Sequence, residues 1–164
     1  MRTCCTVFLV CLLFTACGDD VEFNYPAFQA SKDGVLWKSL SQEAISTSGI
    51  LTISSRVNAE IITLEITNST GLDTLGVAKT SKAIYKDAEG TIYSTLYSAV
   101  DNPETPNIDE SLVSYSEGEV NIIEINNSEG YVSGEFWFTA YDSTGVNKVN
   151  FNQGVFYQVP LVTE

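Results

Sequence analysis

Short stretches in which apolar and polar residues alternate dominate the chain after Pro26, and this period of two constrains the fold most. In the stretch 59–67, Ile62, Leu64 and Ile66 would lie on one face of a strand, with polar side chains on the other. Gly, Asp and Asn separate the stretches, as turns between strands require. Helical spacing of apolar residues is almost absent, so we predict an all-β protein.

Turn signals indicate how the strands are joined. Asp33-Gly34 lies between two alternating arms and predicts the first hairpin, because Gly accepts a positive φ angle without steric cost. Another hairpin is expected within 81–97, with its turn near residues 88–90. The side chains expected to pack there are Tyr85, Ile92 and Leu96.

The pattern gives about nine short strands, too many for one flat sheet with a dry face. We therefore predict one domain over residues 26–164, an antiparallel β-sandwich of two sheets, with a small closed or partly closed barrel as the alternative. Trp37 should lie in the core, and the acidic segment 98–111 should be a long loop. The last three strands, expected to form a meander, are 119–126, 131–141 and 146–159.

The first residues are typical of an export signal. A positive start is followed by an apolar run of 13 residues, Cys4 to Ala16, whereas a helix that spans a bilayer needs about 20. We expect residues 1–16 to be removed, Cys17 to be lipidated and residues 17–25 to form an acidic tether. The alternative is that Cys17 is one more cysteine of a leader that is cleaved nearby.

Cysteine placement and charge restrict the partners. All four cysteines lie in the first 17 residues, so the domain holds no disulfide and depends on an apolar core. Without Arg2 the chain has seven basic and 21 acidic residues, a formal charge of −14. Binding to nucleic acid or to anionic head groups depends on Lys and Arg, so both are disfavoured. We expect contact with the membrane only through the acyl chains of the lipid anchor.

Most catalytic chemistry is excluded by composition. The chain has no histidine, and so no standard serine triad or His-ligated zinc site. The mature chain has no thiol beyond Cys17, and no glycine-rich phosphate loop is present. We therefore expect no enzyme and no cofactor.

Carboxylates are the remaining reactive groups. Those in strands could form the acid pair of a glycoside hydrolase, but their positions in the alternation fit outward, solvated side chains. They are Glu65, Glu119, Glu124 and Glu135. Those in the long loop could bind calcium, although acidic loops also serve solubility alone. They are Asp101, Glu104, Asp109 and Glu110.

Aromatic residues occupy both faces of the strand predicted at 131–141. One face carries Val132, Phe136, Phe138 and Ala140, and the other carries Tyr131, Glu135, Trp137 and Tyr141. If the first face is core, Tyr131, Trp137 and Tyr141 form a candidate surface for a ligand or partner. The alternative is that these three rings pack under the long loop or against a neighbouring strand.

The leader, AFQASKDGVLWK, YVSGEFWFTA and NQGVFYQVP together resemble a family of Bacteroidota lipoproteins classed as a domain of unknown function. That family has an F-x-A-x-x-D-G-x-x-W opening, an S-G-x-F-x-F-T-A strand and an N-G-x-F-x-x-V-P ending. Here Asn152-Gln153-Gly154 departs from the simpler Asn-Gly, which could move a bulge. The resemblance implies a lipid-anchored all-β domain and leaves its activity open.

Acidic residues after Cys17 also resemble the signal that exports some of these lipoproteins to the outer face of the outer membrane, although a solvated linker is the alternative. Three functions remain: a surface module that binds a glycan or an envelope protein, a structural or accessory subunit of an envelope complex, and a carboxylate hydrolase. We favour the first two.

Overall fold

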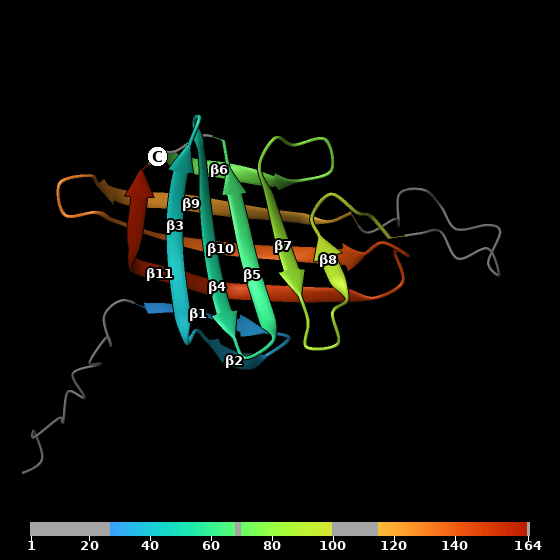
Figure 1. Ribbon diagram of the computed structural model, residues 1–164. Helices are drawn as coiled ribbons and strands as arrows, with labels where there is room; N and C mark the ends of the chain where they lie inside the picture. The colour runs from blue at the N-terminus through green and yellow to red at the C-terminus, as the bar shows by residue number, and fades with distance from the viewer. Residues whose placement is uncertain (1–26, 68–69, 100–114, 164) are drawn as a thin grey trace, which may run out of the picture.

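The computed structural model describes residues 27–67, 70–99 and 115–163 (Figure 1). Within these ranges the chain forms eleven strands and no helix, so the all-β prediction is confirmed. The strands are β1 (Ala27–Lys32), β2 (Val35–Lys38), β3 (Ser41–Thr47), β4 (Ile50–Val57), β5 (Glu60–Ile66), β6 (Gly71–Gly76), β7 (Lys82–Lys86), β8 (Ile92–Ser94), β9 (Glu117–Asn126), β10 (Tyr131–Asp142) and β11 (Lys148–Thr163).

The strands form two crossed layers that are joined at their margins. Sheet I has the order β2-β1-β11-β10-β9-β6, and sheet II has the order β3-β4-β5-β7-β8. In Figure 1 the strands β3, β4, β5 and β7 run almost upright, across the direction of β9 and β10. Pairing of β11 with β3 and of β8 with β10 joins the two sheets into a partly closed ring. This combines the predicted sandwich with its partly closed barrel alternative.

Strand β11 forms one corner of the ring. Its first part pairs antiparallel with β10, whereas Leu161–Thr163 pair parallel with β3. Two residues of β11 have positive φ angles, Gln153 (51°) and Gln158 (49°), and the register shifts at both places. Such bulges bend a strand and increase its twist, which lets β11 pass from one sheet to the other. The parallel pairing is a departure from the purely antiparallel prediction.

The predicted hairpins and meander are present. Asp33 and Gly34 both have positive φ, 48° and 85°, as a two-residue turn between Lys32 and Val35 requires. Strands β7 and β8 pair as a hairpin, and β9, β10 and β11 pair in sequence order.

Two strands, β3 and β6, were not predicted. The only apolar side chain of β3 that is fully buried is Ala44, and β6 lies at an edge with glycine at both ends. Neither strand carries the apolar alternation that marks a half-buried strand.

The prediction that Ile92 and Leu96 pack inside is wrong. Their exposed fractions are 50% and 43%, whereas Tyr85 is 2% exposed. Tyr93 pairs directly with Tyr85 and their ring centroids are 5.8 Å apart. Paired residues share a face, so Tyr93 faces inward beside Tyr85 and Ile92 faces outward. Leu96 lies in the turn that follows β8.

Most aromatic side chains of the core lie on sheet I, and the side chains that sheet II contributes are mostly aliphatic. Sheet I contributes Phe28, Trp37, Phe136, Phe138, Phe151 and Phe156, and sheet II contributes Leu51, Ile53, Ile62, Leu64, Ile66 and Tyr85. The core positions predicted for Trp37 and for the Ile62, Leu64 and Ile66 face are therefore confirmed.

Three phenylalanines of sheet I lie opposite glycines on the neighbouring strand. The pairs are Phe138 with Gly118, Phe156 with Gly134, and Phe136 with Gly154. A Cβ atom added at any of these glycines would come closer than 3 Å to the partner residue. Glycine therefore makes room at these positions for tightly packed phenylalanines on the inner face.

Candidate functional site

The outer face of sheet I carries a hollow of about 500 Å³, here named the Trp137 hollow. Strands β6, β9, β10 and β11 contribute its lining. The lining residues are Leu72, Glu119, Asn121, Glu135, Phe136, Trp137, Gln153, Gly154 and Val155.

The register of four strands brings these side chains together. Leu72, Asn121, Glu135 and Val155 follow one another across the sheet as direct cross-strand partners. Trp137 and Glu119 form the next pair along β10 and β9. These partners share a face of the sheet, so they line one continuous surface.

The bulge in β11 adds Gln153 to this surface. Phe136 pairs with Gly154 and Phe138 with Phe151, so Trp137 lies opposite two residues, Asn152 and Gln153. A bulge redirects the side chains of its strand, and Gln153 here lines the hollow. The sequence departure at Asn152-Gln153-Gly154 therefore coincides with an element of the candidate site.

Trp137 is half-buried, and its orientation is fixed by a hydrogen bond. Its Nε1 donates to Oε2 of Glu119 over 3.1 Å. The ring forms part of the wall of the hollow, with the polar side chains of Asn121, Glu135 and Gln153 around it. Trp137 thus remains part of the candidate surface.

Tyr131 and Tyr141 do not belong to that surface, because their exposed fractions are only 8% and 4%. The hydroxyl of Tyr131 donates to Glu124 over 2.8 Å and accepts a hydrogen bond from Asn126, so it is held within the β9–β10 hairpin. Tyr141 lies where β8 pairs with β10 on one side and β11 pairs with it on the other. The three rings therefore do not form one exposed stripe.

The Trp137 hollow is acidic. Glu119 and Glu135 line it, and no lysine or arginine does. Across the ranges that the structure describes, the ion pairs are Lys32 with Glu60 and Lys82 with Glu65, and neither carboxylate of the hollow takes part. Of the four strand acids singled out above, only Glu119 and Glu135 come together, since Glu65 is paired on sheet II and Glu124 binds Tyr131.

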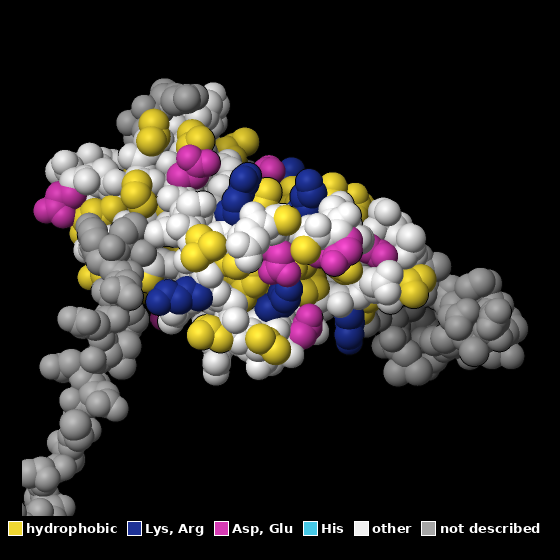
Figure 2. Space-filling view, turned by 60° about the horizontal axis from the view of Figure 1, so that its bottom comes forward, with side chains coloured by type: hydrophobic (Ala, Val, Ile, Leu, Met, Phe, Trp, Pro, Cys, Tyr) yellow, Lys and Arg dark blue, Asp and Glu magenta, His cyan; other side chains and the backbone are white. Residues whose placement is uncertain are grey.

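A second polar cluster closes one end between the sheets. Lys32 Nζ donates to Glu60 Oε1 over 2.6 Å and to the Tyr85 hydroxyl over 2.8 Å, and Trp37 Nε1 donates to Glu60 Oε2 over 2.7 Å. Figure 2 shows this end of the molecule, where acidic and basic side chains are interspersed. A hollow of about 230 Å³ lies there, also lined by Lys148 and several acids.

These contacts shift three pKa values. Burial alone would raise the pKa of Glu60, but the hydrogen bonds from Lys32 and Trp37 hold it below its ordinary value. Burial raises the pKa of Tyr85 to about 12, although the Lys32 ammonium opposes that rise. The pKa of Lys32 is raised because Glu60 and Tyr85 outweigh the effect of burial. The cluster joins β1 and β2 of sheet I to β5 and β7 of sheet II, and we interpret it as a structural clamp.

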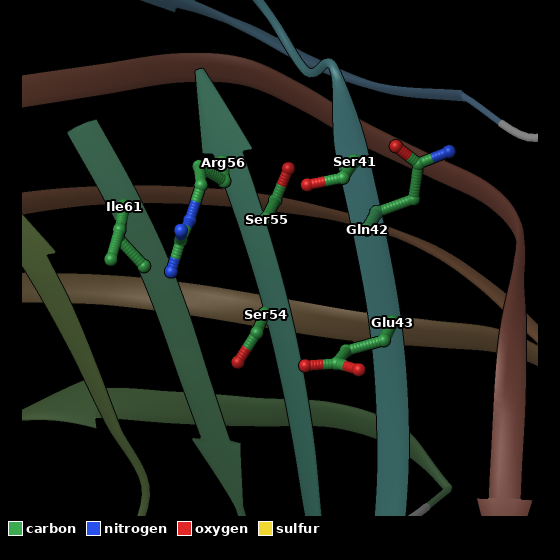
Figure 3. A pocket seen from close by; sticks show the side chains of 7 residues that line it. All are labelled: Ser41, Gln42, Glu43, Ser54, Ser55, Arg56 and Ile61. Carbon is green, nitrogen blue, oxygen red and sulfur yellow. The ribbon is translucent and has the colours of Figure 1, made fainter. Parts of the chain in front are cut away.

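A third hollow, of about 420 Å³, lies over β3, β4 and β5 of sheet II. Figure 3 shows Arg56 beside Ile61, and Glu43 reaching toward Ser54. Its lining contains no aromatic ring. The buried hydroxyl of Ser55 has no hydrogen-bond partner among the described residues. Because this hollow lacks an aromatic ring and the second cluster is interpreted as a structural clamp, we regard the Trp137 hollow as the candidate site.

Other predicted sites lie outside the described residues, namely Cys17, the tether and the loop acids Asp101, Glu104, Asp109 and Glu110. In the described ranges, no group of three or more His, Cys, Asp or Glu side chains could hold a metal ion. The same ranges contain no helix that is long and apolar enough to span a membrane.

Comparison with known protein families gives a match over most of the chain. A family model described as a domain of unknown function, DUF6252, matches residues 24–160. No curated protein and no solved structure matches the chain.

Proposed function

This chain belongs to the DUF6252 family of domains of unknown function, and we propose that it is a non-catalytic binding module that takes a glycan in the Trp137 hollow. One observation carries the proposal. A half-buried tryptophan, fixed by a carboxylate, forms part of a hollow whose other polar groups are carboxylates and amides.

This set of groups matches the chemistry of a sugar. The apolar C–H face of a pyranose can lie against an indole ring, and its hydroxyls can donate to carboxylates and exchange hydrogen bonds with amides. Asn121 and Gln153 supply amides, and Glu135 supplies an exposed carboxylate. Because Glu119 already fixes the ring of Trp137, this side chain would lose little conformational entropy when a glycan binds.

We further propose that the domain is exported and held at the outer membrane by a lipid on Cys17, with its binding face toward the cell exterior. The apolar leader, the cysteine that follows it and the acidic residues after that cysteine support this location. Two alternatives are that the same face binds an envelope protein and that the domain is an accessory subunit of an envelope complex.

A carboxylate hydrolase is the second candidate, since Glu119 and Glu135 line the same hollow from adjacent strands. A general acid of this kind works in apolar surroundings that favour its protonated form. Glu135 is exposed and so lacks such surroundings, and Glu119 is already engaged as the acceptor of the Trp137 indole N–H. Release of shorter saccharides from a bound glycan would favour the hydrolase over the binding module.

The test is a glycan array probed with the full-length lipidated protein in detergent micelles, followed by calorimetry on the glycans that bind. Trp137→Ala should weaken binding at least tenfold, a loss of about 1.4 kcal/mol. Tyr115→Ala is the matched control, because it removes an aromatic ring that is 59% exposed and lies outside the hollow. Absence of glycan binding, or equal binding by the wild type and Trp137→Ala, would refute the proposal. Capture of an envelope protein that requires Trp137, without glycan binding, would favour the partner-protein alternative.

A further inference from the structure

We propose that the Trp137 hollow selects glycans by charge. It accepts saccharides that are neutral or carry a protonated amine, and it rejects saccharides that carry a carboxylate or sulfate group. This inference rests on the proposed function, that a glycan binds in this hollow.

The charge of the hollow has one sign. Glu119 and Glu135 both line it, and its other lining residues are uncharged. The hydrogen bond from Trp137 Nε1 is donated by a neutral group, so it leaves the negative charge of Glu119 in place. Neither carboxylate is ion-paired within the described part of the chain.

The basic residues of sheet I do not cancel this charge. Lys38 on β2 pairs with Gln29, which pairs with Val155, which pairs with Glu135. Three strand spacings separate Lys38 from Glu135, about 14 Å. This exceeds the Debye length of about 8 Å at physiological ionic strength, so Lys38 is largely screened.

Lys79 is the other basic residue near this face. It follows β6, and its side chain lies close to Gly76, which pairs with Glu117. Glu117, two residues before Glu119 on β9, carries a negative charge that offsets the positive charge of Lys79. The remaining bases of the described ranges lie elsewhere: Lys32 and Lys148 line the end between the sheets, and Arg56, Lys82 and Lys86 lie on sheet II.

A negatively charged sugar would therefore be repelled by the uncompensated negative charges of Glu119 and Glu135. At about 5 Å, and with an effective dielectric constant of 20 to 80, repulsion between two carboxylates lowers affinity roughly 4-fold to several-hundredfold. An ammonium group at the same place would be attracted to Glu135 and to the face of Trp137. The expected order of affinity is amine-bearing, then neutral, then acidic saccharides.

The first test uses the full-length lipidated protein on an array that holds neutral, amine-bearing, uronate-bearing and sulfated glycans. Bound glycans that are all neutral or amine-bearing, and whose binding requires Trp137, support the inference. Trp137-dependent binding of acidic glycans overturns charge selection but leaves the proposed function intact. Binding of no glycan overturns the proposed function and the inference with it.

The second test measures selectivity. A neutral glycan from the array is compared with its form oxidised to the uronate at C6, and we expect at least tenfold weaker binding of the oxidised form. Glu135→Gln should reduce that ratio at least threefold. Glu43→Gln removes the same charge from the outer face of sheet II and should leave the ratio unchanged. The same ratio in wild type and Glu135→Gln, or an equal reduction in Glu43→Gln, would count against selection by this hollow.

Discussion

Gly154→Ala tests whether the glycine opposite Phe136 is required by packing. An added Cβ would lie 2.5 to 2.6 Å from three atoms of the Phe136 ring, and these are its three nearest neighbours. Ordinary carbon–carbon contacts are about 3.5 to 4.0 Å, so the ring would have to move by roughly 1 Å. Phe136 is 3% exposed and its centroid lies 5.0 Å from that of Phe28, so it has little space to move into.

The magnitude follows from two opposing effects. Overpacking of a core costs about 1 to 3 kcal/mol, and three simultaneous close contacts place this site toward the upper end. Alanine also restricts the unfolded chain, and this stabilises the folded protein by about 0.4 to 1 kcal/mol where alanine fits the backbone conformation. Gly154 meets this condition because it does not have a positive φ. We expect a net loss of about 2 kcal/mol in the free energy of unfolding. For a domain of this size the melting temperature should fall by roughly 6 to 8 °C.

Urea unfolding followed by circular dichroism measures this loss, and a double-mutant cycle identifies its cause. The three atoms nearest to the added Cβ belong to the Phe136 ring, and Phe136→Leu removes two of them, Cε1 and Cζ, so this change should relieve much of the clash, with a favourable coupling of about 1 to 2 kcal/mol. Gly118→Ala is the matched control, since its Cβ would lie 2.5 Å from the Trp137 carbonyl oxygen and 2.9 Å from the Cα of Phe138. Phe138→Leu leaves those atoms in place and should rescue much less. Additive effects of Gly154→Ala and Phe136→Leu would refute the reasoning.

Three further predictions concern the clamp and the anchor. Glu60→Gln should lower the free energy of unfolding by about 1 to 2 kcal/mol at pH 7, because the charged bond to Lys32 is lost, as urea unfolding would show. Because the pKa of Glu60 is lower in the folded state, its contribution to the free energy of unfolding is present above the unfolded-state pKa near 4.5 and is lost as pH falls through the folded-state pKa. Below that pH the wild type and Glu60→Gln should have the same free energy of unfolding. The pKa of Tyr85 is raised from 10.0 to about 12, so its contribution to the free energy of unfolding is complete below pH 10 and is lost as pH rises toward 12. In Tyr85→Phe the free energy of unfolding should fall less between pH 10 and 12. Cys17→Ala should move the protein from the membrane pellet to the soluble fraction, and unchanged sedimentation would contradict lipidation of that cysteine.

Local signals in the sequence were sufficient for much of the fold. Asp33-Gly34 predicts its hairpin because the turn needs two positive φ angles, and the β5 alternation predicts its buried face because the period of a strand is two. Strand β6 gives no such signal, since an edge strand that buries Leu75 and little else needs no apolar alternation. The corner in β11 depends on which two sheets the strand joins, and that is a property of the whole topology.

The candidate site was predicted only in part, because it depends on register. Alternation along β10 places Trp137 outside and Phe136 inside, and the structure agrees. Alternation does not show that β8 replaces β9 beside Tyr141, nor that Tyr131 bonds to Glu124, and both tyrosines are buried as a result. It also gave no sign that Glu119 would meet Trp137, because that contact depends on the pairing of two separate strands.

Strand β10 connects the packing of the core with the candidate site. Phe136 and Trp137 are consecutive, so the ring over Gly154 and the indole in the hollow are attached to the same stretch of backbone. The bulge that brings Gln153 to the hollow also precedes the glycine that accepts the Phe136 ring. A side chain at position 154 would therefore push on the core and on the strand that carries Trp137 together. We infer that the close packing of sheet I does more than stabilise the domain, because it also fixes the position of the surface on which the proposed ligand would lie.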